Sequence, residues 1–504
     1  MKILLDRQSD IPVYLQIREY LRDLIQSGTL RPGDRLPSIR KLAKESQVNK
    51  LTAIEAYSVL EGDGLIQARQ GSGYFVEPPI ASSPVQSSKF NPDQTVTVMA
   101  HAKSTYYRAC TDSIAARQTQ TAIDLSCGIP SQEGLDDLKR IARRVSSRVT
   151  DDLFFYDYPQ GRHELRLQIA RLLAHIGLNS SPDNIVVTSG SMQGISIAFH
   201  HYLKPGDWAI VENPTFHGAL AALSNMGAKI IGIPMAPDGM NLELLEQYLQ
   251  SHQPKLIYTI SNLHNPTGIT TSREHKQRLL QLAQQYQCPV VEDNAYELLH
   301  FDGDVPLSIK AMDRHECVTY IGTFTKAIAP GLRVGYMVPP QQTHQALVEN
   351  KLVRDLHSAT LSQTIVSEYL ASGYYRRRLS KLRSSNLHCR NLMLQAMERW
   401  FPSDVTWTVP QGGLFLWVHL PDRMSGEAVY QAAFERGVVV YPGNLFFADQ
   451  QGYSAFRLSY SIQPDAIEPA VQIVGDILHD LMAQSASGFL ETPVPFETPA
   501  LLES

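Results

Sequence analysis

The sequence predicts a multidomain protein, in which a small unit of three helices and a β-hairpin precedes a larger α/β unit. The 504 residues exceed the usual size of one hydrophobic core, so two or three domains are expected. A stretch rich in Pro, Ser and Gln, without an apolar period, separates two patterned regions. We therefore predict domains at 1–77 and 121–482, a linker at 78–120 and a flexible tail at 483–504.

Composition, charge and cysteines restrict the class of protein. Hydrophobic residues make up 43% and charged residues 19%, which excludes a mainly disordered or fibrous chain. The net charge of −5 is uninformative about nucleic acid, because averaging hides the charge of single domains. The five cysteines form no Cys-x-x-Cys pair, so neither a metal site nor a disulfide framework is predicted. Without a signal peptide or a run of about 18 apolar residues, we expect a cytoplasmic protein with no membrane segment.

The N-terminal unit is predicted from helical and strand periodicity. Apolar residues recur at helical spacing over 13–25, and Ser38 is the expected N-cap of a short helix that ends near residue 43. A third helix is predicted over about 49–61. Two apolar runs within 65–76, joined by a glycine-bearing turn, predict a β-hairpin. Three helices and a hairpin make a winged helix-turn-helix.

The basic residues of this unit suggest DNA binding. Between residues 31 and 50, six basic residues stand against two acidic ones. The N-terminal residues of a recognition helix read base edges, which here are Asn49, Lys50 and Thr52. Arg40, near the start of the preceding helix, can reach a guanine or a phosphate, and the tip of the hairpin can approach a minor groove. Any one of these cations alone is more often a solvated surface residue, so the prediction depends on their arrangement.

The run from Leu36 to Val76 resembles the GntR-type winged helix, including its Pro-Ser-x-Arg-x-Leu-Ala start and its Gly-Ser-Gly wing. The resemblance implies a DNA-binding surface made of Ser38, Arg40, Asn49, Lys50, Thr52 and Gly71. Leu51 and Ile54 stand where polar or basic residues are common in such helices. The base contacts therefore do not carry over.

The larger unit alternates short apolar runs with longer helical stretches. The runs are NIVVTSG, WAIVENP, KLIYTISN, PVVEDNAY and VTYIGTFTK. Such alternation predicts a mostly parallel sheet flanked by helices.

The strongest chemical signal is Lys326 in TFTKAIAPGLRVGY, between a strand and a glycine-bearing loop. A lysine that forms a Schiff base with an aldehyde needs a lowered pKa, which a buried, cation-rich pocket supplies. Thr323 and Thr325 offer hydroxyls, and Arg333 offers a guanidinium fork, for a phosphate group. A lone lysine would more often be a surface residue, but these three candidate phosphate ligands flank this one.

Two further motifs would hold the ring of such a cofactor. Asp293, at the end of VVED, could keep a pyridine nitrogen protonated, and Tyr296 could donate to the phenolic oxygen of the ring. Asn265 in HNPTG would place an amide against the same oxygen. Taken alone, Asp293 could equally cap a turn at the end of a strand, and Asn-Pro-Thr-Gly is also an ordinary turn.

A phosphate site and a stacking face complete the set. The motif TSGSMQGI leads from a strand through Gly190, Ser191 and Met192 into a helix, whose first N–H groups form an anion site. Phe216 in ENPTF offers a flat apolar face to the ring.

In this order, the motifs resemble those of fold-type I aminotransferases from about Asp124 to Met482. The resemblance implies a mostly parallel seven-stranded sheet, a smaller α+β subdomain over about 375–482, and pyridoxal 5'-phosphate bound to Lys326. It also implies that Tyr156 enters the site of a partner subunit, that Gly128 covers the substrate, and that Arg457 binds a substrate α-carboxylate. Arg457 could also be an ordinary exposed arginine on a strand, without a role in binding. Its apolar neighbours in the sequence favour a buried arginine that binds a carboxylate.

A GntR-type winged helix joined to an aminotransferase-like domain is the layout of the MocR/PdxR subfamily of transcriptional regulators, which this chain resembles over nearly its whole length. That resemblance implies a homodimer, a double-stranded DNA operator, and an amino acid or amine effector that shifts the dimer between states. A working aminotransferase with a DNA-binding domain is the alternative, because every residue that transamination needs is intact. A sensor that has lost the cofactor is disfavoured by the intact Lys326.

Overall fold

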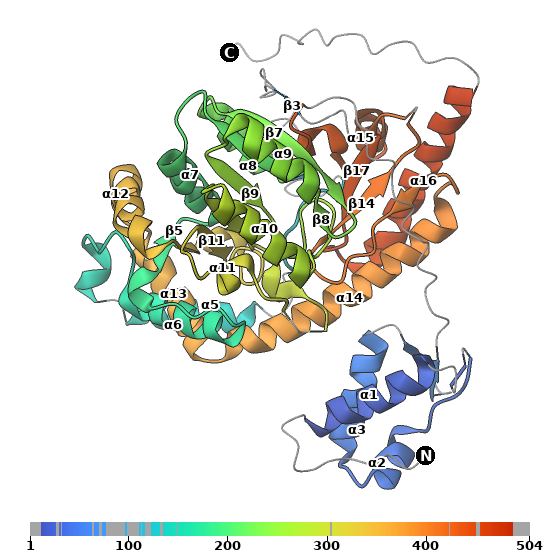
Figure 1. Ribbon diagram of the computed structural model, residues 1–504. Helices are drawn as coiled ribbons and strands as arrows, with labels where there is room; N and C mark the ends of the chain where they lie inside the picture. The colour runs from blue at the N-terminus through green and yellow to red at the C-terminus, as the bar shows by residue number, and fades with distance from the viewer. Residues whose placement is uncertain are drawn as a thin grey trace, which may run out of the picture.

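The computed structural model covers both patterned regions and parts of the segment between them (Figure 1). The residues described are 12–26, 30–31, 33–62, 65–69, 73–76, 96–97, 110–111, 113–115, 122–131, 135–148, 150–302, 305–422, 424–449 and 454–486. Gly71, a predicted DNA contact, lies outside these residues. No helix within these ranges is long and apolar enough to cross a membrane.

The N-terminal unit is a winged helix with the predicted elements. These are α1 (Val13–Gln26), α2 (Ile39–Glu45), α3 (Lys50–Gly62), β1 (Ile66–Arg69) and β2 (Gly73–Val76). Ser38 caps α2, since its hydroxyl accepts a hydrogen bond from the backbone N–H of Lys41 at 3.3 Å. β1 and β2 pair antiparallel, and Gly73 has a φ of +102°, which favours glycine. The predicted helices are confirmed to within two residues at each end.

The core of the winged helix is small and apolar. Ile17 and Leu21 of α1 pack with Leu42 of α2 and Leu60 of α3, and all four are fully buried. Tyr57 of α3 donates its hydroxyl to the carbonyl of Pro37 at 2.7 Å. This bond ties the turn before α2 to α3, and so fixes the angle between the two helices.

The larger region is built around a sheet of nine strands among the described residues. They are β3 (Val96–Thr97), β5 (Val186–Thr188), β6 (Trp208–Asn213), β7 (Lys229–Ala236), β8 (Gly239–Met240), β9 (Leu256–Thr259), β10 (Val290–Asp293), β11 (Val318–Thr323) and β12 (Gly335–Val338). Along the order β7-β6-β9-β10-β11-β12-β5, β12 runs antiparallel to its neighbours and the other strands run parallel. These seven strands are the predicted sheet, and the two-residue strands β3 and β8 add to its β7 edge.

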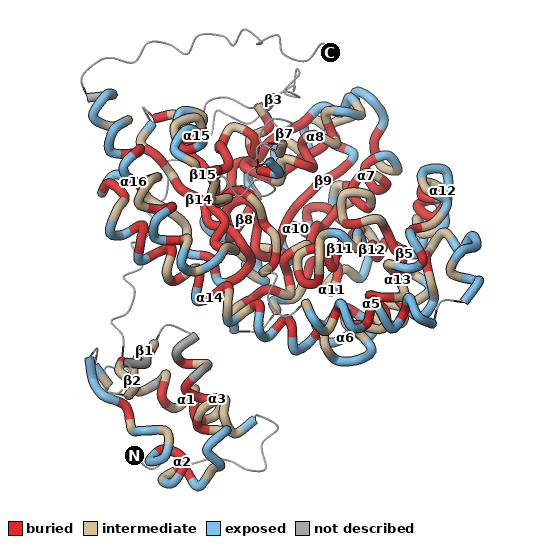
Figure 2. Tube along the Cα trace, turned by 180° about the vertical axis from the view of Figure 1, so that it is seen from behind, coloured by how far each residue is buried: buried red, intermediate tan, exposed pale blue. Residues whose placement is uncertain are grey.

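Helices cover both faces of this sheet, and Figure 2 shows its strands buried between them. One face packs against α7 (Ser191–Tyr202), α8 (His217–Asn225) and α12 (His344–Asp355), and the other against α9 (Leu242–His252), α10 (Arg273–Gln285) and α11 (Ile309–Met312). Successive strand residues serve opposite faces, as Val290 and Val291 of β10 do. Three more helices, α5 (Asp136–Ser147), α6 (His163–His175) and α13 (Thr360–Ala371), form a separate core with the β5 end of the sheet.

A smaller subdomain follows. It contains α14 (Tyr374–Trp400), α15 (Gly426–Glu435), α16 (Pro464–Ala486) and the antiparallel strands β13 (Thr406–Trp407), β14 (Phe415–His419), β17 (Ala455–Ser459) and β16 (Tyr441–Pro442), in that sheet order. β4 (Ile123–Asp124) pairs in parallel with β15 (Val438–Val439) of the same subdomain. The first residues of the aminotransferase-like region therefore pack with the last, which brings the segment around Gly128 back to the centre of the molecule.

Two parts of the chain differ from the predicted organisation. Within the predicted linker, β3 pairs with β7, and Ser113 donates its hydroxyl to Asp124 at 2.8 Å. At the other end, α16 continues to Ala486, past the predicted start of the tail at 483. Compositional signals place a linker or a tail only approximately, because short contacts with a folded domain have no sequence period of their own.

Candidate functional site

Lys326 lies in the loop after β11, with its side chain partly buried. Its Nζ donates to the backbone carbonyl of Gly128 at 2.9 Å, and lies 5.8 Å from the centre of the Tyr296 ring. Burial lowers the pKa of Lys326, and the nearby Arg457 and Arg333 lower it further. A lowered pKa increases the neutral fraction of the amine, which is the form that attacks an aldehyde.

Asp293 is the last residue of β10, next to β11. Tyr258 of β9 donates its hydroxyl to Asp293 Oδ2 at 2.9 Å. The other oxygen, Oδ1, is buried and makes no hydrogen bond with any residue that the structure describes. Burial raises the pKa of Asp293 to about 6, although Tyr258 and the nearby Lys326 act in the opposite direction. Such an oxygen is unusual, because buried polar atoms nearly always have a partner.

Arg457 of β17 is buried at the centre of an aromatic box. Its guanidinium carbon lies 3.7 Å from the centre of the Phe415 ring, 4.8 Å from that of Tyr441 and 5.0 Å from that of Phe446. It donates to Asn265 Oδ1 at 2.7 Å and to the backbone carbonyl of Ser126. The buried Nε has no hydrogen-bond partner among the described residues. The box therefore holds a positive charge with unused donor capacity.

Asn265 and Tyr296 lie between Arg457 and Lys326. Both are buried, and the Asn265 side chain hydrogen-bonds with Tyr296. Burial raises the pKa of Tyr296, so its hydroxyl stays protonated and can donate near neutral pH. Gly128 closes this region from the other side, and a Cβ on it would lie 2.3 Å from the Phe415 ring.

The predicted phosphate ligands meet at the start of α7. Gly190 has a φ of +83°, and a Cβ on it would lie 2.3 Å from a guanidinium nitrogen of Arg333. That guanidinium donates to the carbonyl of Ser189 at 3.1 Å, and Ser191 begins the helix. Backbone N–H groups and a guanidinium thus converge as an anion site requires. Only glycine at 190 allows this approach.

The other predicted cofactor ligands take different positions. Thr323 and Thr325 are buried and bond to one another at 2.9 Å, and Thr323 also donates to the carbonyl of Val334. Phe216 is the N-cap of α8, partly buried, with Met192 beside it in the same core. Tyr156 is not part of the cluster in this chain, because it is 84% exposed and contacts the ring of His357.

Several residues of the site were not predicted from sequence, among them Phe446 of the aromatic box. Tyr258, Phe415 and Tyr441 contact Asp293 or Arg457 as described, and His217 stacks on Tyr441 with ring centres 5.0 Å apart. Burial holds the pKa of His217 well below its usual value, so the ring is neutral. Apart from Phe446, these residues lie on buried strands or next to Phe216, where an aromatic side chain is usually part of the core and gives no separate signal.

The predicted DNA-binding residues lie at the surface of the winged helix. Arg40 and Lys50 are exposed, and Leu51 is 73% exposed. Asn49 caps α3, since its Oδ1 accepts from the backbone N–H of Thr52 at 2.7 Å and from its hydroxyl at 3.0 Å. The side-chain oxygen of Asn49 is therefore already engaged, which leaves its amide and Lys50 as donors at the tip of the helix.

Comparison with known proteins assigns both parts of the chain. Residues 13–76 match the family described as bacterial regulatory proteins, gntR family, and residues 120–474 match the aminotransferase class I and II family. The Escherichia coli protein named uncharacterized HTH-type transcriptional regulator YdcR is 31% identical, over 93% of this chain and 99% of its own length. The Rhizobium meliloti protein named probable rhizopine catabolism regulatory protein MocR is 26% identical, over 87% and 88%.

Solved structures agree for the larger region. The α-aminoadipate aminotransferase LysN of Thermus thermophilus, in complex with N-(5'-phosphopyridoxyl)-L-leucine, is 29% identical with a TM-score of 0.69, covering 76% of this chain and all of that one. With both parts present in one polypeptide, the chain belongs to the MocR-type helix-turn-helix transcriptional regulators, in which a GntR domain precedes an aminotransferase domain of fold type I.

Proposed function

We propose that this regulator binds pyridoxal 5'-phosphate at Lys326 together with an amino compound, and that occupancy of the site controls its affinity for a DNA operator. One observation carries the proposal. The same site contains a lysine amine of lowered pKa and a buried carboxylate oxygen, Asp293 Oδ1, that makes no hydrogen bond within the described residues.

The residues present fit the cofactor. Asp293 Oδ1 would accept from the protonated ring nitrogen, Phe216 would lie against the ring, and the phosphate would take the N–H groups at the start of α7 and the Arg333 guanidinium. The cofactor when bound supplies an aldehyde for the lysine amine and a ring that withdraws electrons. A carboxylate that pairs with a charged ring stays ionised, so binding would lower the pKa of Asp293 from about 6.

The effector is best described as an amine that carries a carboxylate. Arg457 is buried among three aromatic rings, and its Nε is without a partner in the described structure. A carboxylate on the guanidinium would gain charge-assisted hydrogen bonds in a site shielded from water. Asn265 and Tyr296 then lie between that carboxylate and Lys326, where the amino group of the effector would be.

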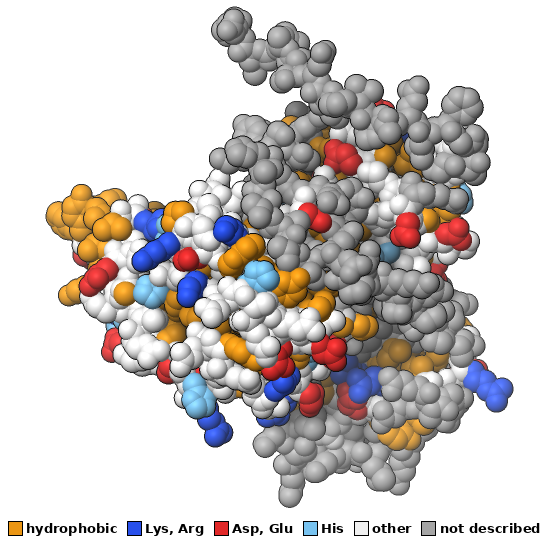
Figure 3. Space-filling model, turned by 45° about the horizontal axis from the view of Figure 1, so that its top comes forward, with side chains coloured by type: hydrophobic (Ala, Val, Ile, Leu, Met, Phe, Trp, Pro, Cys, Tyr) orange, Lys and Arg blue, Asp and Glu red, His pale blue; other side chains and the backbone are white. Residues whose placement is uncertain are grey.

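A second copy of the chain is the proposed partner of the aromatic patch, which comprises Phe154, Phe155, Tyr156 and Tyr158 together with Val353, Leu356 and Leu361. All seven side chains are exposed. The patch borders a groove of about 490 Å³, and Figure 3 shows hydrophobic side chains gathered at the end of the molecule that carries α12. Exposed patches of this kind mark protein interfaces. In a twofold dimer Tyr156 would reach the site of the partner subunit, which explains its absence from the cluster here.

Two winged helices in such a dimer would bind paired half-sites. The exposed Arg40 and Lys50 would contact phosphates and bases at the N-terminal end of α3. Leu51 would meet an apolar group such as the methyl of thymine. An effector that binds one arrangement of the dimer more tightly would change the spacing of the two winged helices, and with it the affinity for the operator.

A working aminotransferase is the second candidate. The observation that favours it is that the residues needed for transamination are all present in one site: Lys326, Asp293, Tyr296, Asn265 and Arg457. Multiple turnovers of an amino donor by the purified full chain, without binding to DNA upstream of its own gene, would favour this candidate over regulation.

The test of the cofactor claim uses the buried lysines of the chain as internal controls. The full-length protein is incubated with pyridoxal phosphate, reduced with borohydride, digested and analysed by mass spectrometry. We expect the added mass on Lys326 and not on Lys276 or Lys351, which are held by Asn262 and Asp355. Lys326→Ala should lose the yellow colour. A colourless wild type, or labelling of another lysine, would contradict the claim.

The test of regulation measures DNA binding by gel shift. The wild type, with and without the cofactor and a panel of amino acids and amines, is compared with Lys326→Ala on DNA upstream of its own gene. We expect at least one amino compound to change the affinity of the wild type and not that of the variant. Equal affinities under all conditions would contradict regulation through this site.

A further inference from the structure

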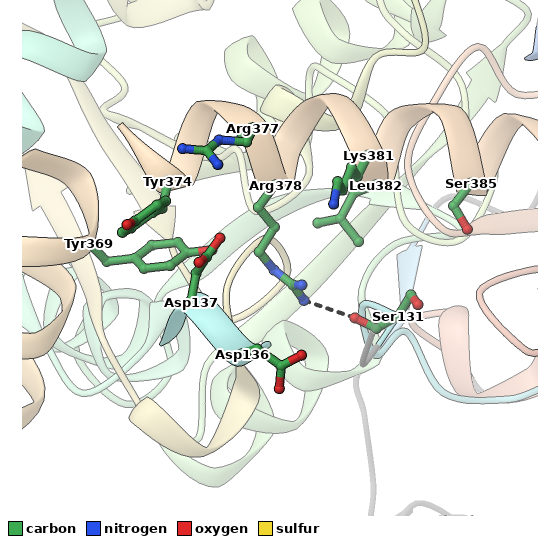
Figure 4. A pocket seen from close by; sticks show the side chains of 10 residues that line it. All are labelled: Ser131, Asp136, Asp137, Tyr369, Tyr374, Arg377, Arg378, Lys381, Leu382 and Ser385. Atoms are coloured by element: carbon green, nitrogen blue, oxygen red, sulfur yellow. Dashed lines mark hydrogen bonds between the residues drawn. The ribbon is translucent and has the colours of Figure 1, made fainter. Parts of the chain in front are cut away.

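Near its N-terminus, α14 carries a buried arginine that contacts the loop of Lys326. Arg378 is only 4% exposed. Its Nε donates to the carbonyl of Ala327 at 2.9 Å. A terminal nitrogen donates to the carbonyl of Ser131 at 2.8 Å, the hydrogen bond drawn as a dashed line in Figure 4. One planar guanidinium thus holds the backbone of two segments that are distant in sequence.

Both segments meet at the Lys326 amine. Ala327 is the residue after Lys326, and Ser131 follows Gly128 by three residues. The Gly128 carbonyl accepts the hydrogen bond from Lys326 Nζ. Arg378 therefore fixes the position of the lysine backbone and, through the same group, the position of the loop that contacts the lysine amine.

Burying a charged guanidinium against neutral carbonyl groups costs free energy, so we expect the contact to have a structural role. Burial lowers the pKa of Arg378, which shows that the charged group is partly removed from water. Arg390, more than three turns further along α14, makes a similar hydrogen bond to the carbonyl of Pro410 at 2.8 Å, and burial lowers its pKa as well. Pro410 is remote from the lysine loop in sequence, so Arg390 offers a matched contact on the same helix.

We propose that Arg378 is a positioning residue for Lys326: it clamps the lysine loop to the loop 128–131, so that the amine points into the site. The inference rests on the proposed function, because it assumes that Lys326 captures the aldehyde cofactor. Without the clamp, the amine would sample more positions, and the cofactor would be held less tightly.

The cavity beside Arg378 provides an unusual test. It has a volume of about 400 Å³ and is lined on the other sides by Asp136, Asp137, Tyr369, Tyr374 and Leu382, as Figure 4 shows. Truncation of Arg378 would extend this cavity to the Ala327 and Ser131 carbonyls. A small guanidinium ion from solution could then enter the space left by the arginine side chain and restore the lost hydrogen bonds.

The experiment compares Arg378→Ala, Arg378→Lys and Arg390→Ala in the full-length protein, with the cofactor dissociation constant and the visible spectrum as readouts. Loss of the hydrogen bonds to Ala327 and Ser131 should weaken cofactor binding of Arg378→Ala by about tenfold. Methylguanidinium at millimolar concentration should restore binding of this variant. It should have no effect on the wild type or on Arg390→Ala, and Arg378→Lys should retain part of the affinity.

Wild-type affinity in Arg378→Ala, or a loss that methylguanidinium does not restore while Arg390→Ala shows the same loss, would overturn the inference. If Arg378→Ala does not fold, Arg378→Lys decides the matter, because a displaced lysine loop must change the pH at which the cofactor spectrum titrates. An unchanged titration would overturn the inference. A wild type that binds no cofactor would instead refute the proposed function, so the two failures are distinguishable.

Discussion

The winged helix and the proposed cofactor site differ in how the chain builds them. The proposed DNA-binding face comes from one short stretch, in which Ser38 and Asn49 cap consecutive helices and Arg40 and Lys50 remain exposed beside them. The proposed cofactor site collects Gly128, Gly190 and Arg457 from strands and loops far apart in sequence. A site assembled locally at the surface tolerates the loss of one contact, whereas a buried site depends on each close approach.

The largest effect is expected at Gly190. An alanine there would be strained at a φ of +83°, and its Cβ would displace the Arg333 guanidinium. Strain of 1 to 3 kcal/mol and a lost ligand predict about hundredfold weaker cofactor binding. Gly331→Ala is the matched control, since a Cβ at 331 meets nothing within 4 Å. Titration of each variant with pyridoxal phosphate provides the measurement, and equal losses at the two glycines would contradict the proposed phosphate site.

The double variant Arg40→Ala/Lys50→Ala tests the proposed DNA-binding surface of the winged helix. Loss of two cations at the DNA face should weaken operator binding by about tenfold or more, and should reduce the slope of log K against log salt by about 2. Lys139→Ala, an exposed cation on α5, is the control and should change neither quantity. Fluorescence anisotropy at several salt concentrations measures both, and an unchanged slope would place the DNA elsewhere.

Asn49 separates the role of a helix cap from that of a DNA contact. Asn49→Ala removes the acceptor for the Thr52 N–H and should destabilise the winged helix by about 1 kcal/mol. Asn49→Asp keeps the cap, so it should retain stability yet bind DNA less tightly because it adds a negative charge. Thermal unfolding and anisotropy of both variants decide this. If Asn49→Asp is as unstable as Asn49→Ala, capping is not the structural role of this residue.

The smallest effect is expected behind the cofactor site, at Glu297. Burial raises the pKa of Glu297 to about 8, so the folded protein holds a proton that the unfolded chain loses near pH 4 to 5. The stability that depends on this proton is present at low pH and falls as the pH rises through about 8. Glu297→Gln cannot lose a proton, so its Tm relative to the wild type should rise by several degrees between pH 5 and pH 8.

Tyr320→Phe gives the matched control, because it removes the hydroxyl that donates to Glu297. Without that donor the carboxylate loses a stabilising contact, so the decline of stability with pH should become steeper in this variant. A Glu297→Gln curve parallel to that of the wild type would show that Glu297 is ionised throughout.

The sequence by itself determined the elements and the chemistry of single residues. Periodicity located α1, α2 and α3 and five of the central strands, namely β5, β6, β9, β10 and β11, because the period of apolar residues depends on local geometry and on which face is buried. The seven-stranded sheet as a whole was implied only by the resemblance to aminotransferases. Motif order indicated the family, which the comparisons establish.

Only the tertiary structure decided which groups meet. Tyr258 lies next to Asp293 because β9 and β10 are neighbours in the sheet, and Phe415 lies on Arg457 because β14 pairs with β17. Likewise, Arg378 reaches Ser131 because the segment that follows β4 returns to the smaller subdomain, where β4 pairs with β15. Such contacts depend on strand order and on chain return, which the local pattern of residues does not specify.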